Sequence, residues 1–386
     1  MVWRDSFAFD LSEEEAFACD TASAFAQKEV APLAAKIDRE HYFPRELLPK
    51  MGDLGLMGAI VPPEFGGAGL STVAYALIIE ELSAACASTG IIVSAHTSLC
   101  VFPILEYGTQ EQKEYFLPRL ASGKALGCFA LSEPGTGSDA AAISTTYRRD
   151  GDDFIVTGTK NWITNGPEAD ICVLFASSDP QKGNKGISAF VHDMNLPGIS
   201  RGKHEDKMGI RGSPTSSIMY DEVRLPKTAL LHQENRGFTV AMTTLNGGRI
   251  GVAAQAIGIA RSAFDDSFKY SQERRAFGKM VCEHQSIQNY FADMVCHIDS
   301  ARYLTLDAAK RKDQGKQFLR HAAMAKLFAS ETAMMCAVKG IQIHGGYGYV
   351  TDYPAERHLR DAKITEIYEG TSEIQRILIA TQLLKE

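Results

Sequence analysis

The chain has 386 residues, of which 45% are hydrophobic and 23% are charged. This composition is typical of a folded globular protein, so a fibrous or disordered chain is excluded, and the length predicts two or three domains. The net charge of −7 argues against a protein that acts on nucleic acid or on an anionic membrane surface.

The eight cysteines form no C-x-x-C pair and are not accompanied by histidines at metal-ligand spacing. We therefore expect free thiols in a reducing compartment and no metal site. The first residues lack the basic start and the apolar run of an export signal. The most apolar stretch, residues 74–95, carries Glu80 and Glu81 near its middle, which predicts that it does not span a membrane. These features predict a soluble, intracellular protein.

Residues 12–120 have a helical pattern. Ser12 and Glu15 fit a capping box that begins a helix, and apolar residues then recur three and four positions apart. Prolines and the glycine-rich turn at residues 66–69 interrupt the pattern, and helical spacing resumes over residues 72–87. His96, near the end of this region, is expected to be a structural residue without a catalytic role.

Residues 126–226 contain short runs of β-branched and aromatic residues. They predict strands near residues 154–156, 161–164, 171–175 and 187–191. Glycine, Asn and Asp residues separate these runs, and no ten-residue helical pattern lies between them. This region is therefore predicted to be an antiparallel sheet or barrel without βαβ units.

Residues 135–140 match the G-x-G-x-x-A form of the dinucleotide-binding fingerprint. That motif needs a strand before it and a long helix after it, because the helix N-terminus binds the pyrophosphate. Only residues 139–143 are available for a helix before strand patterns resume. We therefore reject a nicotinamide-binding Rossmann domain.

From residue 237 to the end the pattern is helical again. Ile287, Tyr290, Met294, Ile298 and Ala301 fall on one helix face, as in a helix bundle. The chain is thus predicted to be an α+β protein of three domains. They are an N-terminal α-helical domain (1–123), a middle β domain (124–230) and a C-terminal four-helix-bundle domain (231–386).

Four segments resemble motifs of the acyl-CoA dehydrogenase family. They are residues 129–139 (FALSEPGTGSD), 162–166 (WITNG), 342–346 (QIHGG) and 367–376 (IYEGTSEIQR), with a weaker match at 63–67 (PEFGG). Any one of them could arise by chance, but together they cover the chain in the family's order and spacing. Residues 184–190 and 205–212 are most similar to the short-chain, butyryl-CoA-type members.

The resemblance implies a fold of three domains, with FAD between the β domain and the C-terminal bundle. It also implies a homotetramer, in which a neighbouring subunit completes each flavin site. The implied reaction is oxidation of a short-chain acyl-CoA to the trans-2-enoyl-CoA, with an electron-transferring flavoprotein as the acceptor of electrons. The implied location is the bacterial cytoplasm or, for a mature eukaryotic chain, the mitochondrial matrix.

This reaction needs a base aimed at the weakly acidic α proton while hydrogen bonds hold the enolate oxygen. The β hydrogen leaves as a hydride, which flavin N5 accepts. The resemblance identifies Glu369 as the base, and its backbone N–H with a flavin ribityl hydroxyl as the donors to the thioester oxygen. Other family members carry the base at the position of Gly248, just before Arg249. Gly248 has no carboxylate, which argues against the isovaleryl-type and long-chain-type branches.

The residues around Glu369 fit this role. Ser372 and Gln375 fit a capping box, so we expect a helix to begin there with Glu369 just before its positive end. The helix end lowers the pKa of a carboxyl group whereas burial raises it, and the sequence leaves open which effect prevails. Gly370 gives the backbone the freedom to turn the carboxylate into a cavity.

The remaining site residues follow from the resemblance. In the middle domain the expected flavin contacts are Phe129, Ala130, Leu131, Ser132, Gly137, Ser138, Trp162, Ile163 and Thr164, with the Thr164 hydroxyl at flavin N5. In the C-terminal domain they are Arg274, Phe277, Gln285, Gln342, Ile343, Gly345, Gly346, Thr371, Ser372 and Glu373, with Arg274 reaching the pyrophosphate of FAD in the adjacent subunit. The expected substrate contacts are Ser138, Asn246, Gly247, Gly248, Arg249, Tyr368 and Gly370. Short-chain members commonly have Asp at the position of Asn246, and this departure leaves the CoA contact open, because an amide can donate where a carboxylate cannot.

Three alternatives are carried forward. The first is the same chemistry on a branched or alicyclic acyl-CoA. The second is a flavin oxidase on the same fold, although acyl-CoA oxidases carry long C-terminal additions that are not expected here and nitroalkane oxidases have Asp at the position of Glu369. The third is a non-catalytic flavoprotein, which the presence of Glu369 and both flavin segments disfavours.

Overall fold

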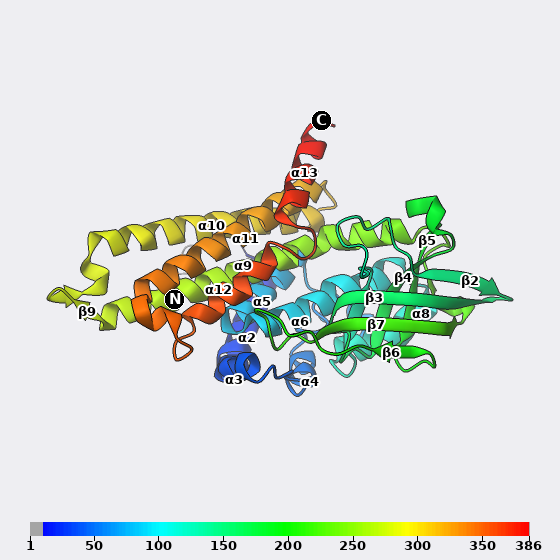
Figure 1. The fold of residues 1–386 in the computed structure, drawn as a ribbon, viewed down its shortest axis with the longest axis horizontal. Coiled ribbons are helices and arrows are strands. Elements are labelled where there is room, and N and C mark those ends of the chain that lie inside the picture. The colour runs from blue at the N-terminus through cyan, green and yellow to red at the C-terminus, as the bar shows by residue number, and fades with distance from the viewer. Residues whose placement is uncertain (1–10, 386) are drawn as a thin grey trace.

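The computed structural model describes residues 11–385, so the chain start that bears on an export signal lies outside the described range. Strands β1–β8 gather at one end of an elongated molecule, and the long C-terminal helices extend to the other end, where the short β9–β10 hairpin lies (Figure 1). The N-terminal helices are α2 (Glu13–Phe25), α3 (Ala34–Arg39), α4 (Leu47–Asp53), α5 (Thr72–Ala85), α6 (Ala87–Ala95), the π-helical η4 (His96–Val101), α7 (Phe102–Tyr107) and α8 (Gln110–Ala121).

The predicted capping box at the start of α2 is confirmed. The Ser12 hydroxyl accepts from the Glu15 backbone N–H at 3.2 Å, and the Glu15 carboxylate accepts from the Ser12 N–H at 2.9 Å. Residues 72–87 are helical only as far as Ala85, because Cys86 has an extended backbone with φ −160° and ψ 112°. The apolar stretch 74–95 is therefore two helices and not one.

The two acidic residues of that stretch lie inside the fold. Arg261 donates to Glu80 at 2.5 Å and to Glu81 at 2.6 Å, and Arg302 contacts Glu80 at 3.0 Å. Within residues 11–385, one helical run, Ala87–Tyr107, is long and apolar enough to cross a membrane. Of its most apolar window 89% is buried within the fold, as in the core helix of a globular domain.

The middle of the chain forms one eight-stranded sheet. Its strands are β1 (Gly127–Ala130), β2 (Thr146–Asp150), β3 (Asp153–Thr164), β4 (Ile171–Ser177), β5 (Ile187–Asp193), β6 (Ile199–Arg201), β7 (Thr215–Leu225) and β8 (Leu230–Leu231). The order is β6-β7-β3-β2-β4-β5-β8, and β1 pairs with β4. The four predicted strand segments lie in β3, β4 and β5, and residues 135–140 lead into no helix, as expected from the rejected fingerprint.

The prediction of an antiparallel sheet is right for most strand pairs and wrong for two. Strand β1 runs parallel to β4, from Gly127 opposite Ile171 to Ala130 opposite Leu174, and β2 meets β4 in parallel at one residue pair. Parallel neighbours need a crossover connection, and the sequence offered no helix for one. The loop after β1 and the β2–β3 hairpin together make this connection, so the sheet is mixed.

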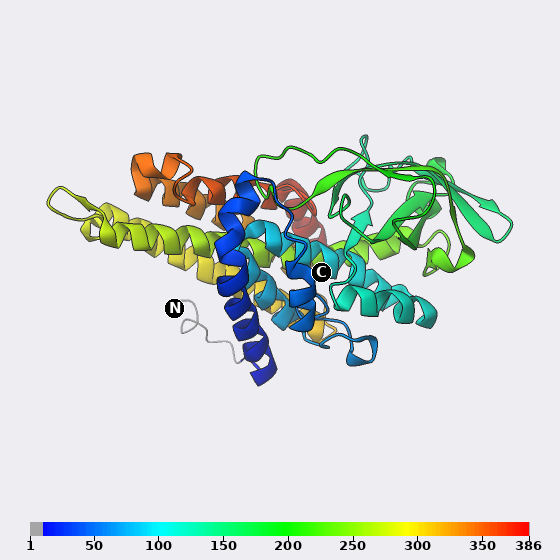
Figure 2. The same cartoon turned by 90° about the horizontal axis from the view of Figure 1, so that it is seen from below.

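The C-terminal part is built on one very long helix. Its elements are α9 (Gly237–Glu273), the hairpin strands β9 (Arg275–Ala276) and β10 (Lys279–Met280), α10 (Gln285–Asp313), α11 (Leu319–His344), α12 (Ala355–Thr365) and α13 (Ser372–Leu383). With 37 residues, α9 is about 55 Å long, and it runs from the sheet to the hairpin at the far end (Figures 1 and 2).

Helices α9, α10, α11 and α12 pack on one another, and α5 packs on α9. On α10, Met294, Ile298 and Ala301 are fully buried, while Ile287 and Tyr290 pack at the margin of the same core. This confirms the predicted bundle face. All eight cysteines are free thiols, and residues 11–385 contain no group of His, Cys, Asp or Glu that could hold a metal ion.

Candidate active site

Glu369 lies in the short turn between α12 and α13. Its backbone has φ 53° and that of Gly370 has φ 95°, so both residues are in the left-handed half of φ space. A non-glycine residue rarely adopts this conformation, and here it turns the Glu369 side chain back toward α9. The turn therefore depends on the positive φ of both residues and not on Gly370 alone.

The predicted helix start is correct, but the predicted cap is wrong by one residue. The N-cap of α13 is Thr371, whose side chain accepts from the Ile374 N–H at 3.4 Å. Ser372 is the first helical residue. Gln375 does not complete a capping box, because its side-chain amide is drawn to the carbonyl oxygens of Gly370, at 2.8 Å, and Glu369, at 3.3 Å.

The Glu369 carboxylate is buried without a hydrogen bond. The residue is partly exposed as a whole, but both carboxylate oxygens are inaccessible and neither has a hydrogen-bond partner among the described residues. A Cβ atom built on Gly248 would lie 2.2 Å from Oε2, so the carboxylate occupies the space that a side chain at 248 would need. Burial raises the pKa of Glu369 from 4.5 to about 7, against the lowering effect of Lys326 and Arg249. Burial thus prevails over the helix end.

Two buried cations flank this carboxylate. Arg249 is buried on α9, where Nη1 donates to Asn246 Oδ1 at 2.6 Å and Nε has no partner among residues 11–385. Burial lowers the pKa of Arg249 to about 10. Lys326, on α11, is fully buried and its Nζ donates to the Gly370 carbonyl at 2.8 Å. The structure therefore brings together Asn246, Gly248, Arg249, Glu369 and Gly370, as expected.

Glycines on α9 let polar side chains of other helices approach it closely near the carboxylate. One turn after Gly248, a Cβ at Gly251 would lie 2.5 Å from the Tyr75 hydroxyl and 2.4 Å from Ser94 Oγ. These two hydroxyls are 3.0 Å apart. Tyr368, beside the base, donates to the side-chain oxygen of Gln255 on the next turn of α9. Hydrogen-bonded polar side chains therefore pack against α9 next to the carboxylate.

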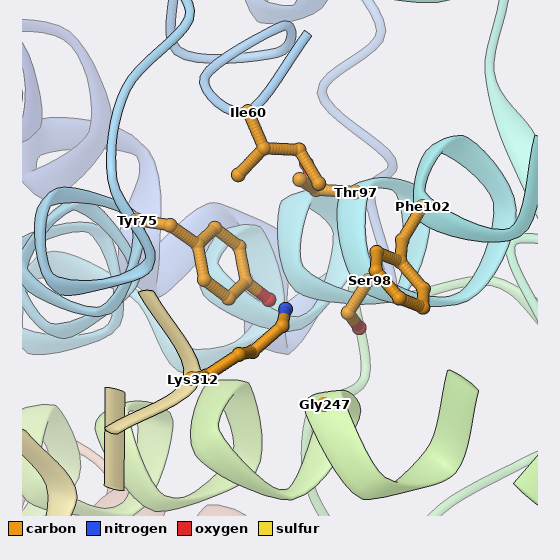
Figure 3. A pocket seen from close by; sticks show the side chains of 7 residues that line it. All are labelled: Ile60, Tyr75, Thr97, Ser98, Phe102, Gly247 and Lys312. Carbon is orange, nitrogen blue, oxygen red and sulfur yellow. The ribbon is translucent and has the colours of Figure 1, made fainter. Parts of the chain in front are cut away.

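A small pocket lies on the other side of Tyr75 (Figure 3). Its lining residues are Ile60, Tyr75, Thr97, Ser98, Phe102, Gly247 and Lys312. The Lys312 and Tyr75 side chains point toward each other across it, and the Lys312 ammonium lies 4.6 Å from the centre of the Phe102 ring (Figure 3). Gly247 therefore faces this pocket and Gly248 faces Glu369.

The residues expected at the flavin ring lie along strands β1 and β3 and the loop after β1. Trp162 stands out, because it is 60% exposed with φ 59° in the irregular stretch of the β3–β7 pairing. Ser132 and Thr164 are partly exposed, and Gly137 and Ser138 are exposed. Ala130, Leu131 and Ile163 are buried in the core.

A buried ion pair holds this loop. Lys160 Nζ lies 2.7 Å from Glu133 Oε1 and donates to the Leu131 carbonyl at 3.1 Å. The Glu133 carboxylate also accepts from the backbone N–H groups of Ser144 and Thr145. Both charged side chains are almost wholly inaccessible to solvent.

The expected flavin residues Arg274, Phe277, Gln285 and 342–346 form a second group at the far end of α9, whereas Thr371, Ser372 and Glu373 lie beside Glu369 at the start of α13. The Arg274 guanidinium lies 5.5 Å from the Tyr347 ring centre, which places it beside the Gln342–Gly346 segment. Phe277, in the hairpin, is 97% exposed, and Gln285 is exposed at the start of α10. Arg274 is about 37 Å along α9 from Arg249. The structure therefore separates this group from Glu369 within one chain.

Several site residues were missed from the sequence. Lys326 stands alone among alanines on the buried face of α11, and a charged residue at a core position of a helix is a signal for a buried role. Tyr75, Ser94 and Gln255 reach the site only through tertiary packing, so no local pattern identifies them. Gln375 is predicted from the sequence to cap the helix with Ser372, but its side chain instead donates to the Glu369 and Gly370 carbonyls.

Known proteins match this chain along most of its length. Family models for the N-terminal, middle and C-terminal domains of acyl-CoA dehydrogenases match residues 12–124, 128–223 and 235–384. The mitochondrial short-chain specific acyl-CoA dehydrogenase of Homo sapiens is 52% identical over 376 residues, covering 97% of this chain and 91% of that protein.

Two solved structures have the same fold. Butyryl-CoA dehydrogenase from Megasphaera elsdenii superimposes with a TM-score of 0.96 at 43% identity, covering 98% of this chain and 100% of the other. A chain solved in work on the electron transferring flavoprotein of Acidaminococcus fermentans superimposes with a TM-score of 0.97 at 46% identity, with the same coverage. The chain belongs to the acyl-CoA dehydrogenase family.

Proposed function

We propose that this protein catalyses the FAD-dependent α,β-dehydrogenation of a short-chain acyl-CoA, with Glu369 as the base that removes the α proton. The observation that carries the proposal is the Glu369 carboxylate, whose two oxygens are buried and have no hydrogen-bond partner among the described residues. A carboxylate left without a partner in a closed space is costly unless a ligand completes the site. Its pKa of about 7 suits a group that takes up and releases a proton near neutral pH.

The exposed residues of the middle domain fit a planar aromatic cofactor. Trp162 presents a large indole to solvent, and Cβ atoms added at Gly135 or Gly137 would meet nothing within 4 Å, so this surface has room for a bound group. In this proposal Trp162 packs on the isoalloxazine ring, and the Thr164 hydroxyl and the nearby backbone hydrogen-bond its edge. The flavin, when bound, supplies acceptance of the β hydrogen as hydride.

The chain's own groups provide the remaining steps. Glu369 takes the α proton, its backbone N–H hydrogen-bonds the thioester oxygen, and the buried Arg249 and Lys326 provide positive charge close to the carbon that loses the proton. Electrostatic help of this kind is strongest where water is excluded. Ser138, Asn246 and Arg249 are proposed to contact the CoA half. Because the Asn246 side-chain oxygen already accepts from Arg249, its amide N–H remains available to donate to CoA.

The walls around the carboxylate favour a short acyl chain. The hydrogen-bonded pair of Tyr75 and Ser94 packs against Gly251, and the hydrogen-bonded pair of Tyr368 and Gln255 lies beside Glu369. These hydroxyl and amide groups are hydrogen-bonded to one another, so an added methylene would have to displace a formed contact. A pocket discriminates such homologues by about 1–3 kcal/mol per methylene, so a branched or alicyclic acyl-CoA remains the second candidate.

The proposal extends to the assembly and the electron acceptor. The separation of Arg274, Phe277 and Gln342–Gly346 from Trp162 favours a flavin site shared between two subunits of a homotetramer. An exposed Phe277 also fits a residue that a neighbouring subunit or its cofactor covers. An electron-transferring flavoprotein is the proposed acceptor, and the similar chain from Acidaminococcus fermentans supports this link.

The test is an anaerobic visible spectrum of the FAD-loaded protein before and after butyryl-CoA is added. We expect the flavin absorption to bleach, and we expect Glu369→Gln to retain the flavin spectrum but to bleach at least about a hundredfold more slowly. Hexanoyl-CoA and isobutyryl-CoA then rank the substrates. Bleaching by isobutyryl-CoA alone would replace the straight-chain assignment. Rapid reoxidation of the bleached flavin by oxygen would favour an oxidase.

A further inference from the structure

Lys326 is an unusual residue for the position that it occupies. It lies on the alanine-rich face of α11 and is 0% exposed. Within residues 11–385, no carboxylate lies in ion-pair contact with its ammonium group, which has one hydrogen bond, at 2.8 Å to the Gly370 carbonyl. A buried lysine without a paired carboxylate is costly. Its presence there calls for a function of the charge or of the hydrogen bond.

The acceptor of that hydrogen bond belongs to the turn that carries Glu369. The Gly370 carbonyl receives two donors from two different helices, Lys326 Nζ of α11 and Gln375 Nε2 of α13, each at 2.8 Å. Glu369 and Gly370 both have positive φ, and a glutamate in this region is disfavoured unless its surroundings hold it there. The two donors hold the turn in the conformation that directs the Glu369 side chain to Gly248.

Every helix packed against Lys326 and Glu369 contributes charged or titratable groups near them. They are Arg249 on α9, Lys326 on α11, Glu366 at the end of α12, Glu373 on α13, and the phenols of Tyr75 on α5 and Tyr368 beside the base. Burial lowers the pKa of Lys326 to about 8, while Glu369, Glu366 and Glu373 raise it. In turn Lys326 is the foremost group that lowers the pKa of the Glu369 carboxyl.

We propose that Lys326 is a positioning residue for the base: its ammonium pins the Gly370 carbonyl, holds the carboxylate of Glu369 against Gly248, and favours the ionised form. This rests on the proposed role of Glu369. Without the ammonium the turn loses one of its two donors, and without the charge the buried carboxylate is protonated more readily. Both effects lower the fraction of enzyme that is ready to take the α proton, and neither involves contact between Lys326 and the substrate.

The test separates the hydrogen bond from the charge. Lys326→Met removes both, Lys326→Gln keeps a donor without the charge, and Lys326→Arg keeps the charge. For each FAD-loaded variant, kcat and KM for butyryl-CoA are measured from pH 5.5 to 9. For Lys326→Met we expect a fall in kcat of about ten- to a hundredfold, a KM within about threefold of the parent, and an acid limb of kcat/KM shifted to higher pH.

For Lys326→Gln we expect the same shift of the acid limb with a smaller loss of kcat, and for Lys326→Arg no shift. The matched control is Lys363→Met, which removes an exposed lysine that pairs with Glu366 at 2.6 Å. It should leave the acid limb in place. An unmoved acid limb in FAD-bound Lys326→Met and Lys326→Gln would overturn the inference. Failure of both variants to bind FAD or to fold would also overturn it, in favour of a purely structural lysine.

Failure of this inference can be distinguished from failure of the proposed function. If Glu369→Gln bleaches with butyryl-CoA at the parental rate, Glu369 is not the base and the proposed function falls, whatever the lysine variants do. If Glu369→Gln is inactive and the acid limb ignores Lys326, only the inference about Lys326 falls.

Discussion

At the residue scale, the main feature is a carboxylate whose surroundings make ionisation difficult. Burial raises the pKa of Glu369 to about 7, and two buried cations keep it from rising further. The arrangement suits a base that must hold a proton during the reaction and release it afterwards. The same feature has consequences for pH dependence and for stability.

The pH dependence follows from the sign of the shift. A base acts in its ionised form, so kcat/KM for butyryl-CoA should fall below a pKa near 7 and reach a plateau above it. The measurement is a pH profile on the free FAD-loaded enzyme with stopped-flow detection of flavin reduction. An acid limb near 4.5, the ordinary value for glutamate, would show that the carboxylate is not desolvated in solution.

The contribution of Glu369 to stability falls as pH rises, whereas the expected activity increases. Because the folded-state pKa is raised, the folded protein binds the proton more tightly than the unfolded chain between pH 4.5 and about 7, and stability from this group is lost as pH rises through that window. The full difference corresponds to at most about 3 kcal/mol. Glu369→Gln, which cannot ionise, should therefore unfold at a higher temperature than the parent at pH 8. Calorimetry at pH 8 and pH 5 should show this gain shrinking at the lower pH, and an equal gain at both would contradict the explanation.

Gly248 should be intolerant of even one carbon atom. A Cβ there lies 2.2 Å from Glu369 Oε2, so Gly248→Ala must displace the carboxylate. We expect a loss of kcat of at least about tenfold, because misplacing a catalytic group by an ångström is costly. Alanine is a better helix former than glycine by about 1 kcal/mol, so we expect the unfolding temperature to fall little even though kcat falls. Parental activity in Gly248→Ala would mean that the carboxylate does not rest there.

At the scale of elements, the loop after β1 depends on the buried Lys160–Glu133 pair. Lys160→Met leaves the Glu133 carboxylate buried and unpaired, which should cost about 3–5 kcal/mol of unfolding free energy and weaken FAD binding. Arg148→Met is the control, since it removes the exposed Arg148–Glu222 pair and should cost less than about 1 kcal/mol. Denaturant titration and FAD titration of both variants make the comparison. Similar losses in the two variants would contradict it.

Local signals explain which elements could be predicted. The capping box of Ser12 and the α10 face of Met294, Ile298 and Ala301 are determined by neighbours within a few residues, and both are confirmed. The cap of α13 was misplaced because Thr371 and Ser372 can both cap, and only the tertiary contacts of Gln375 distinguish them. The parallel β1–β4 pair was missed because a strand's partner is chosen by long-range packing.

The same distinction holds for the site. Motifs with a fixed local form predicted Glu369 and the glycines beside it as site residues. Lys326, Tyr75 and Gln255 come from three other helices, and the structure brings them to the site only through the packing of α5, α9 and α11. The domain boundaries after residues 123 and 230 stay a prediction, which limited proteolysis would check.

At the scale of the whole molecule, the length of α9 places the predicted flavin residues of the middle domain far from Arg274 and its neighbours. If one flavin needs Trp162 of one subunit and Arg274 of another, two inactive variants should complement each other. Glu369→Gln and Arg274→Ala, each inactive or weakly active alone, should form hybrids on co-expression in which some sites have both native residues. We expect activity in these hybrids clearly above the sum of the parents. No gain in purified mixed oligomers would argue for a site within one chain.

The contact between Gly248 and the Glu369 carboxylate also constrains how this enzyme could change during evolution. Position 248 is where the resemblance implies that other family members carry their base, and here the two positions compete for one volume. A glutamate gained first at 248 would collide with the existing carboxylate and repel it, whereas loss of Glu369 first would remove the proposed base. Either order is expected to lower activity, so a move of the base from one position to the other is favoured only when both residues change together.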